Sequence, residues 1–391
     1  MDRAPSSNLI LGIETSCDET AAAVVRAGRT VLSNAIASQI ASHAIFGGVV
    51  PEIASREHLR HIVPVVRQAL AEAHASWGDI SAIAVTEGPG LAGALLVGIS
   101  YAKALSFALN KPLIAINHLE GHIHSALLAA AQQHNQLTLP ALALVVSGGH
   151  THLYLVEGED GAWRYQNVGS TVDDAAGEAF DKVARMLGLG YPGGPWISAL
   201  AAHGNARAVP FSFAQIKPKA HRQQRRGPAR KTLHSQDDSE AVYFSYSGIK
   251  TAVSRYLELH GMATAALARH QALAADHTIT PDQMLPLCDQ TTLELIASFQ
   301  HAMVEDLVRK TMRSAERTGA HTVLVSGGVA ANAQLRIRFL EESAARGLTL
   351  GFPAPGLSTD NAAMIAAAAW PKLVHSDFAA PELSAQPSLS L

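Results

Sequence analysis

Apolar runs alternate with polar turns at two places in the chain, and each place predicts a strand, a turn and a second strand. The first unit comprises residues 9–13 and 21–25, and the second comprises residues 142–146 and 153–156. The tetrad Val-Ser-Gly-Gly begins at Val146 in the second unit, and again at Val325 after a third predicted strand. This repetition indicates duplicated α/β units with helices between the strands.

Helical spacing is evident in residues 59–70. Apolar residues recur there at intervals of three and four and predict one buried stripe, formed by Leu59, Ile62, Val63, Val66 and Leu70. His58 and His61 lie off this stripe. We therefore expect both histidines to be solvent-exposed rather than metal ligands.

Composition narrows the class of protein. The 391 residues are 48% hydrophobic and 16% charged, which suits one large or two medium globular domains. With 30 Lys and Arg against 33 Asp and Glu, the net charge is -3, so any RNA contact must be local. Cys17 and Cys288 cannot build a disulfide framework, and residues 1–13 do not read as an export signal. Lys103 interrupts the apolar stretch 92–109. We expect a soluble cytoplasmic protein that does not enter a membrane.

Breaks in the pattern suggest two lobes. The N-terminal lobe is expected at 8–135 and the C-terminal lobe at 138–373, with the last helix packing back on the first lobe. A basic insert at 216–239 carries seven cations and no acid between Lys217 and Lys231. The sequence leaves open whether this insert is a disordered loop or an RNA contact. Residues 381–391 are predicted to be unstructured.

A histidine pair is the first candidate for chemistry. His118 and His122 lie one helical turn apart, about 40° round the helix, whereas Glu120 points away from them. That position counts against a zinc protease, in which the glutamate directly follows the first histidine. Asp360 precedes a predicted helix and is the best third ligand, although a plain N-cap is the commoner use of Asp. If Asp360 reaches the histidines, the set favours Fe(II), with Zn²⁺ also suitable.

Glycine-rich turns and an acidic stripe point towards a nucleotide. Gly148–Gly149 and Gly327–Gly328 follow strands, where small residues let a ligand approach the backbone. A predicted helix at 173–187 would carry Asp174, Glu178 and Asp181 on one face, either as a solvated surface or as ligands of ribose hydroxyls. Residues 88–93 match a dinucleotide-binding motif, but no acid follows the next strand, so this interpretation is disfavoured. No P-loop motif occurs.

Several segments together resemble the bacterial TsaD family. They are residues 12–20, 47–52, 118–122, 146–151, 173–182, 191–195, 247–251 and 358–361. The resemblance implies an α/β protein of the actin, Hsp70 and sugar-kinase (ASKHA) superfold, with two ribonuclease-H-like lobes around a nucleotide cleft. It also implies transfer of the threonylcarbamoyl group from threonylcarbamoyl-AMP to N6 of the adenosine just 3′ of the anticodon. The tRNAs concerned read codons that begin with A.

The resemblance also implies roles for particular residues. His118, His122 and Asp360 are expected to be iron ligands. Adenylate-binding positions are expected at Val145, Val146, Ser147, Gly148, Gly149, Asp181, Gly194 and Asn332. Asp18 and Glu19, in the first cleft turn, are expected to orient water or the nucleophile. Asn117 stands where many members carry another histidine, which excludes a third imidazole ligand there.

The resemblance also implies partner subunits, and the sequence leaves alternative functions open. The family implies a TsaB-like pseudo-paralogue and a TsaE-like ATPase as partner subunits. The main alternative is an ATP-dependent phosphotransferase or ATPase of the same superfold, and a scaffold that only binds nucleotide and partners is a second. Members were formerly described as sialoglycoprotein endopeptidases, and the position of Glu120 argues against a metalloprotease.

Overall fold

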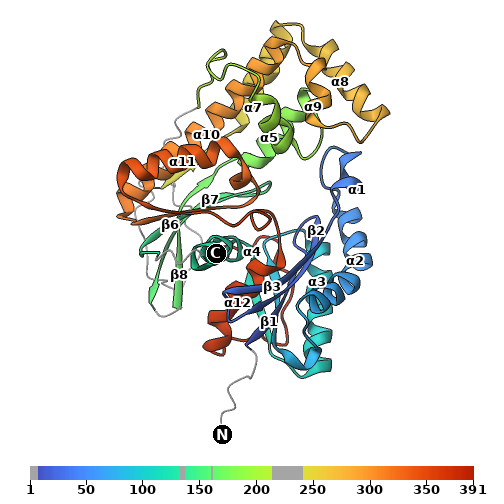
Figure 1. The fold of residues 1–391 in the computed structure, drawn as a ribbon, viewed down its shortest axis with the longest axis vertical. Coiled ribbons are helices and arrows are strands. Elements are labelled where there is room, and N and C mark those ends of the chain that lie inside the picture. The colour runs from blue at the N-terminus through green and yellow to red at the C-terminus, as the bar shows by residue number, and fades with distance from the viewer. Residues whose placement is uncertain (1–7, 133–136, 160–161, 214–240) are drawn as a thin grey trace, which may run out of the picture.

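Two β-sheets form the centres of two lobes, and a pair of helices lies between them (Figure 1). The computed structural model describes residues 8–132, 137–159, 162–213 and 241–391. The basic insert 216–239 therefore lies outside the described residues.

The first lobe contains a five-stranded sheet in the order β3-β2-β1-β4-β5. β1 pairs antiparallel with β2 and parallel with β4, which pairs parallel with β5. The elements are β1 (Leu9–Glu14), β2 (Glu19–Arg26), β3 (Thr30–Ser38), α1 (Ile40–Ala44), α2 (Pro51–Glu72), η1 (Trp77–Asp79), β4 (Ile80–Gly88), α3 (Ala92–Leu109), β5 (Leu113–Asn117) and α4 (His118–Gln132).

The second lobe repeats this arrangement in a six-stranded sheet, β11-β10-β6-β7-β8-β9. β6, β7 and β8 form the antiparallel part, and β10 and β11 continue parallel to β6. The strands are β6 (Ala141–Val146), β7 (Thr151–Glu159), β8 (Ala162–Thr171), β9 (Val242–Phe244), β10 (Thr322–Ser326) and β11 (Thr349–Gly351). The helices are α5 (Ala176–Met186), α6 (Gly193–Ala201), α7 (Ser247–Leu259), α8 (Ala263–Ala275), α9 (Pro281–Met284), η3 (Leu285–Leu287), α10 (Gln290–Thr318), η4 (Gly328–Ala331), α11 (Ala333–Arg346) and α12 (Ala362–Val374). The duplication expected from the sequence is confirmed by the shared strand order.

Both faces of the central strand β1 are covered, which explains its uninterrupted apolar run. Leu9, Leu11 and Ile13 face the core that includes α2 and α3, whereas Ile10 faces α12. At Gly12, an added Cβ would lie 2.4 Å from the carbonyl oxygen of Ala362, so a glycine allows α12 to approach the sheet.

α4 and α12 pack against each other between the two sheets (Figure 1). Leu119 and Ile123 of α4 pack on the second sheet, and α12 covers the first sheet. A Cβ on Gly121 would lie 2.8 Å from Ile365, so this glycine lets the helices come close. The last helix of the chain is thus part of the core of the first lobe.

The expected stripe on α2 is partly wrong. Ile62, Val66 and Leu70 are buried, but Leu59 is 66% exposed, Val63 is 37% exposed and His58 is completely buried. Burial of His58 is tolerated because both ring nitrogens have partners: Thr20 Oγ1 lies 2.8 Å from Nδ1 and the Cys17 carbonyl oxygen 2.9 Å from Nε2.

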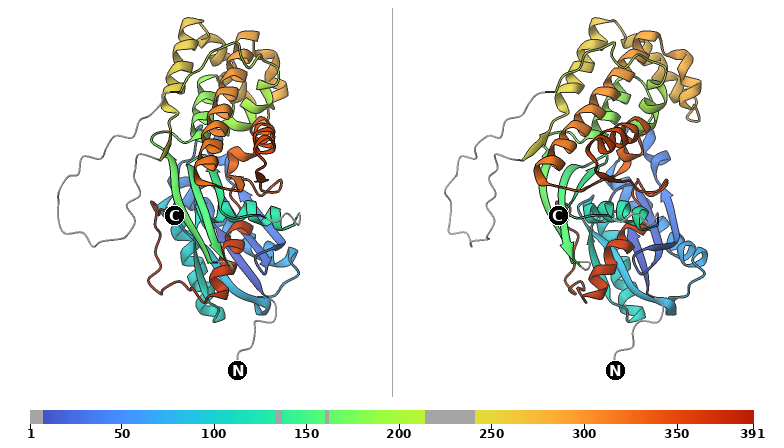
Figure 2. Two further views of the ribbon diagram at one scale, coloured as in Figure 1. Left: turned by 90° about the vertical axis from the view of Figure 1, so that its left-hand side faces the viewer. Right: turned by 60° about the vertical axis from the view of Figure 1, so that its left-hand side comes forward.

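The prediction that residues 381–391 are unstructured is also wrong. The Gln386 amide donates to the Glu87 carbonyl at 2.8 Å, and the Lys103 ammonium donates to the Leu383 carbonyl at 3.1 Å. Leu391 packs against the cluster that contains Tyr165, so the segment passes from the first lobe to the second (Figure 2). Its sequence lacks periodicity because it packs as an extended strap rather than as a helix or strand.

α3 is long and apolar enough to span a membrane by length and composition alone. In the structure it packs against β4 and α2, and Leu95, Ile99 and Ala102 belong to the core of the first lobe. One face of this helix is therefore buried in the fold, whereas Leu96 and Phe107 are exposed.

Candidate metal and nucleotide site

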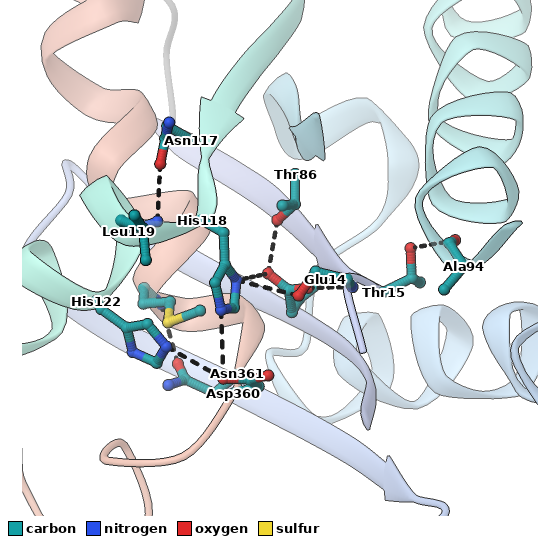
Figure 3. Close-up of polar contacts among 12 residues, drawn as sticks. Glu14, Thr15, Thr86, Ala94, Asn117, His118, Leu119, His122, Asp360 and Asn361 are labelled. Carbon is teal, nitrogen blue, oxygen red and sulfur yellow. Dashed lines mark hydrogen bonds and ion pairs between the residues drawn. The ribbon is translucent and has the colours of Figure 1, made fainter. Parts of the chain in front are cut away.

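The start of α4 and the loop before α12 bring the metal candidates together. His118 begins α4 directly after β5, His122 follows one turn later, and Asp360 lies just before Asn361, the N-cap of α12. Asp360 Oδ1 is 3.6 Å from His118 Nε2 and 3.2 Å from His122 Nε2 (Figure 3). One ligand atom from each residue lies within 4.8 Å of the others. Asp360 is therefore not the N-cap of α12, and it faces both histidines instead.

The donor set fits a metal ion. His122 is completely buried, and its Nδ1 has no hydrogen-bond partner among the described residues. Burial would lower the pKa of His118, but Asp360 and Glu14 outweigh it and raise this pKa to about 9. A cation bound between the histidines and Asp360 would take the place of the proton on His118 and balance the negative charges of Asp360 and Glu14.

Glu14 contacts His118 at Nδ1, the ring nitrogen that does not face Asp360. This contact was not predicted from the sequence. This carboxylate, at the end of β1, lies 3.1 Å from His118 Nδ1 and accepts a 2.6 Å hydrogen bond from Thr86 Oγ1 (Figure 3). Carboxylates in this position orient metal-binding imidazoles. Burial opposes ionisation of Glu14, but His118 lowers its pKa overall. The signal in the sequence was an acid at the end of an otherwise apolar strand.

Glu120 lies away from the ligands, as the helical geometry predicted. Its carboxylate is 3.3 Å from the ammonium of Lys372 on α12, and burial raises its pKa. Glu120 thus ties α4 to α12 and does not face the space between His118, His122 and Asp360.

The two Val-Ser-Gly-Gly turns meet in the second lobe. Gly327 has a φ of 93°, and a Cβ there would lie 2.3 Å from the carbonyl oxygen of Val146. Among the residues that the structure describes, none lies within 4 Å of a Cβ added to Gly148 or Gly149, so their backbone is open to a ligand. Val145 and Val146 are completely buried, which leaves only their main chain available.

The three acids predicted to share one helix face, Asp174, Glu178 and Asp181, have different partners in the structure. α5 begins at Ala176, so Asp174 precedes the helix, and Lys182 pairs with Asp174 at 2.7 Å and with Glu178 at 2.8 Å. Asp181 instead accepts the Gly193 amide at 2.7 Å, beside the predicted position Gly194, where an added Cβ meets nothing within 4 Å.

Asn332 has a structural use that the sequence analysis did not include. Its Oδ1 caps α11 by accepting from the Leu335 amide, and its Nδ2 donates to Gln300 Oε1 at 2.8 Å. Asn332 therefore fixes the turn that follows Gly327 and Gly328.

The charge of an acid in the first lobe acts on groups of the second lobe. Asp18 lies in the turn after β1, Glu19 is the first residue of β2, and Tyr191 belongs to the loop before α6. Burial is the largest cause that raises the pKa of Tyr191, followed by the charges of Asp18 and Asp181. Burial, then Asp18 and Asp360, raise the pKa of Glu19 to about 10. The charge of Asp18 also contributes to raising the pKa of Asp181 in the second lobe.

Two sheets of the same strand order, together with the cluster of His118, His122 and Asp360 and the open glycine turns, are those of a two-lobed α/β protein of the ASKHA superfold. The family model "tRNA N6-adenosine threonylcarbamoyltransferase" (TsaD) matches residues 30–367. The chain belongs to this family, and is therefore an acyltransferase that threonylcarbamoylates tRNA.

Two sequence relatives agree with this assignment. The tRNA N6-adenosine threonylcarbamoyltransferase of Koribacter versatilis is 59% identical over 384 residues, covering 98% of this chain and 99% of that protein. The protein of the same name from Symbiobacterium thermophilum is 47% identical over 390 residues, covering 99% of this chain and 98% of its own. Component A of (R)-2-hydroxyglutaryl-CoA dehydratase from Acidaminococcus fermentans, a solved structure, is 13% identical with a TM-score of 0.45, covering 94% of this chain and 100% of that chain.

Proposed function

We propose that the donor is threonylcarbamoyl-AMP and that the acceptor is the N6 amine of the adenosine just 3′ of the anticodon, in tRNAs that read codons beginning with A. The amine attacks the carbamoyl carbon, the bond from that carbon to the phosphate oxygen breaks, and AMP leaves. The observation that carries this proposal is the convergence of His118, His122 and Asp360 within 4.8 Å, in a chain whose second lobe has two paired glycine turns.

Fe(II) is the proposed metal, with Zn²⁺ as the alternative, because two imidazoles and one carboxylate leave open positions that Fe(II) favours. Bound there, the cation would act as a Lewis acid towards the carbamoyl carbonyl or the adenylate phosphate. His118 and His122 would bind through Nε2, while Glu14 holds the opposite nitrogen of His118.

The adenylate is proposed to lie between the glycine turns. The backbone of Val145, Val146, Ser147, Gly148 and Gly149 would contact its phosphate or purine, with Gly194 beside it. Asp181 is the proposed partner of a ribose hydroxyl, since its carboxylate is held by the Gly193 amide. Asn332 would act near the purine by holding its turn.

Asp18 and Glu19 are proposed to orient the nucleophile. With a pKa of about 10, Glu19 stays protonated at neutral pH and can donate a hydrogen bond. The neighbouring Asp18 is then the better acceptor for the proton that leaves the amine.

The proposed setting is the cytoplasm, with a TsaB-like subunit and a TsaE-like ATPase as partners. The N-terminal lobe is proposed to comprise residues 8–135, and the C-terminal lobe residues 138–373. The basic insert 216–239 remains a candidate tRNA contact because its cations could neutralise phosphates.

The test combines metal analysis with transfer. Protein purified without oxygen should contain about one iron per chain, and should form the modified nucleoside from threonylcarbamoyl-AMP and unmodified tRNA when the partner subunits are present. His122→Ala should lose metal and transfer but keep its fold, whereas His61→Ala, a change on the surface of α2, should keep all three. Phosphate release from ATP by this chain alone, without modified tRNA, would support the phosphotransferase alternative.

A further inference from the structure

One guanidinium touches both halves of the site. Arg336, in the first turn of α11, donates from Nε to the Ala330 carbonyl at 2.7 Å. Its Nη2 lies 3.3 Å from the Pro353 carbonyl and 3.3 Å from Ser358 Oγ. Ala330 belongs to η4, which begins at Gly328 directly after Gly327, and Ser358 lies two residues before Asp360.

The geometry of Arg336 favours a fixed position. Its guanidinium carbon lies 4.6 Å from the centroid of the Phe352 ring, so the planar group stacks while its N–H groups reach two loops. Ser358 is 5% exposed, so losing its contact with Arg336 would leave a buried hydroxyl with one partner fewer. A lysine could keep the charge but could not reproduce the fork of donors.

We propose that Arg336 is a positioning residue that holds the Gly327–Asn332 turn and the Asp360 loop in register, so that nucleoside binding and metal binding strengthen each other. This inference rests on the proposed function in assigning the turn to the adenylate pocket. Because both loops are bonded to one side chain, ordering either loop reduces the conformational freedom that the other must lose. Coupling of this kind is reciprocal.

The experiment measures adenosine affinity by calorimetry, with and without saturating Zn²⁺, in the full chain. Adenosine is the probe because it has no phosphate that could contact the cation directly, and Zn²⁺ does not change its oxidation state. In the wild type, Zn²⁺ should tighten adenosine binding by about tenfold. In Arg336→Lys the two affinities should become equal.

Arg338→Lys is the matched control. Arg338 lies on the same helix but pairs with Glu305 at 2.6 Å and Glu342 at 3.0 Å, away from both loops. The Arg338→Lys variant should therefore keep the wild-type ratio of the adenosine affinity with Zn²⁺ to that without it. Ser358→Ala should reduce the ratio even if Arg336→Lys does not fold. The inference is overturned if Zn²⁺ does not change adenosine affinity in the wild type, or if both Arg336→Lys and Ser358→Ala keep the full effect.

A parallel transfer assay separates this inference from the proposed reaction. A wild type that shows coupling but transfers nothing would refute the proposed donor and leave the role of Arg336 standing. A wild type that transfers but shows no coupling would refute the role of Arg336 alone.

Discussion

The Nδ1 atom of His118 and the Oε2 atom of Glu14 lie 3.1 Å apart, with exposed side-chain fractions of 5% and 0%. β1 supplies the carboxylate, while His118 follows β5, two strands away in the sheet. This bond directs His118 Nε2 towards Asp360, so the sheet itself orients the imidazole.

Replacing Glu14 should weaken metal binding. We expect Glu14→Gln to reduce Zn²⁺ affinity about 10- to 100-fold, since the amide no longer stabilises the donated proton on Nδ1 of His118. Competition with a chromophoric chelator measures the affinity. Glu57→Gln, which alters a partner of His61 on the surface of α2, should leave it unchanged. Equal affinities in the two variants would contradict a supporting role for Glu14.

Asp181 should make stability depend on pH. Burial, with smaller contributions from Asp18 and Glu178, raises its pKa to about 6 despite the bond from the Gly193 amide, against 3.8 for an ordinary Asp. A raised pKa in the folded state means that this contribution to stability is complete below about pH 4 and is lost as the pH rises through about 6. Asp181→Asn removes the titration and retains an oxygen acceptor. Urea unfolding at pH 4, 5, 6 and 7.5 should therefore show the wild type losing stability relative to Asp181→Asn, and parallel pH curves would refute the shift.

The Glu120–Lys372 pair should stabilise the contact between α4 and α12. Lys372→Met leaves a carboxylate that is only 9% exposed without its cation, and we expect a loss of about 3 kcal/mol in the free energy of unfolding. Adding Glu120→Gln should restore part of that loss in a double-mutant cycle. The more exposed Lys182, changed to Met, should cost less than about 1 kcal/mol. Equal costs for both lysine changes would argue against burial as the reason.

The C-terminal strap should detach when Gly88 gains a side chain. A Cβ at Gly88 would lie 1.9 Å from the carbonyl oxygen of Gln386, whereas at Gly78 the nearest atom would be Ser76 Oγ at 3.6 Å. We expect proteases to remove residues after 378 faster from Gly88→Ala than from Gly78→Ala. The same cleavage rate in both variants would show that the strap does not depend on this contact.

The sequence predicted those features that arise from neighbouring residues. Alternating apolar runs predicted the duplicated strand units, and the four-residue spacing of His118 and His122 predicted their shared face, because both patterns follow from the geometry of strand and helix. The motifs that resemble the TsaD family also indicated the fold and the reaction.

Tertiary structure decided the features that depend on distant parts of the chain. Glu14 and His118 are 104 positions apart, and no local pattern states that the ends of β1 and β5 will place them together. Burial of His58 required Thr20 and the Cys17 carbonyl as partners. Likewise, only packing gives Asp181 and Glu178 different partners. The helix places both acids on one side, but the Gly193 amide bonds only to Asp181, whereas Glu178 pairs with Lys182.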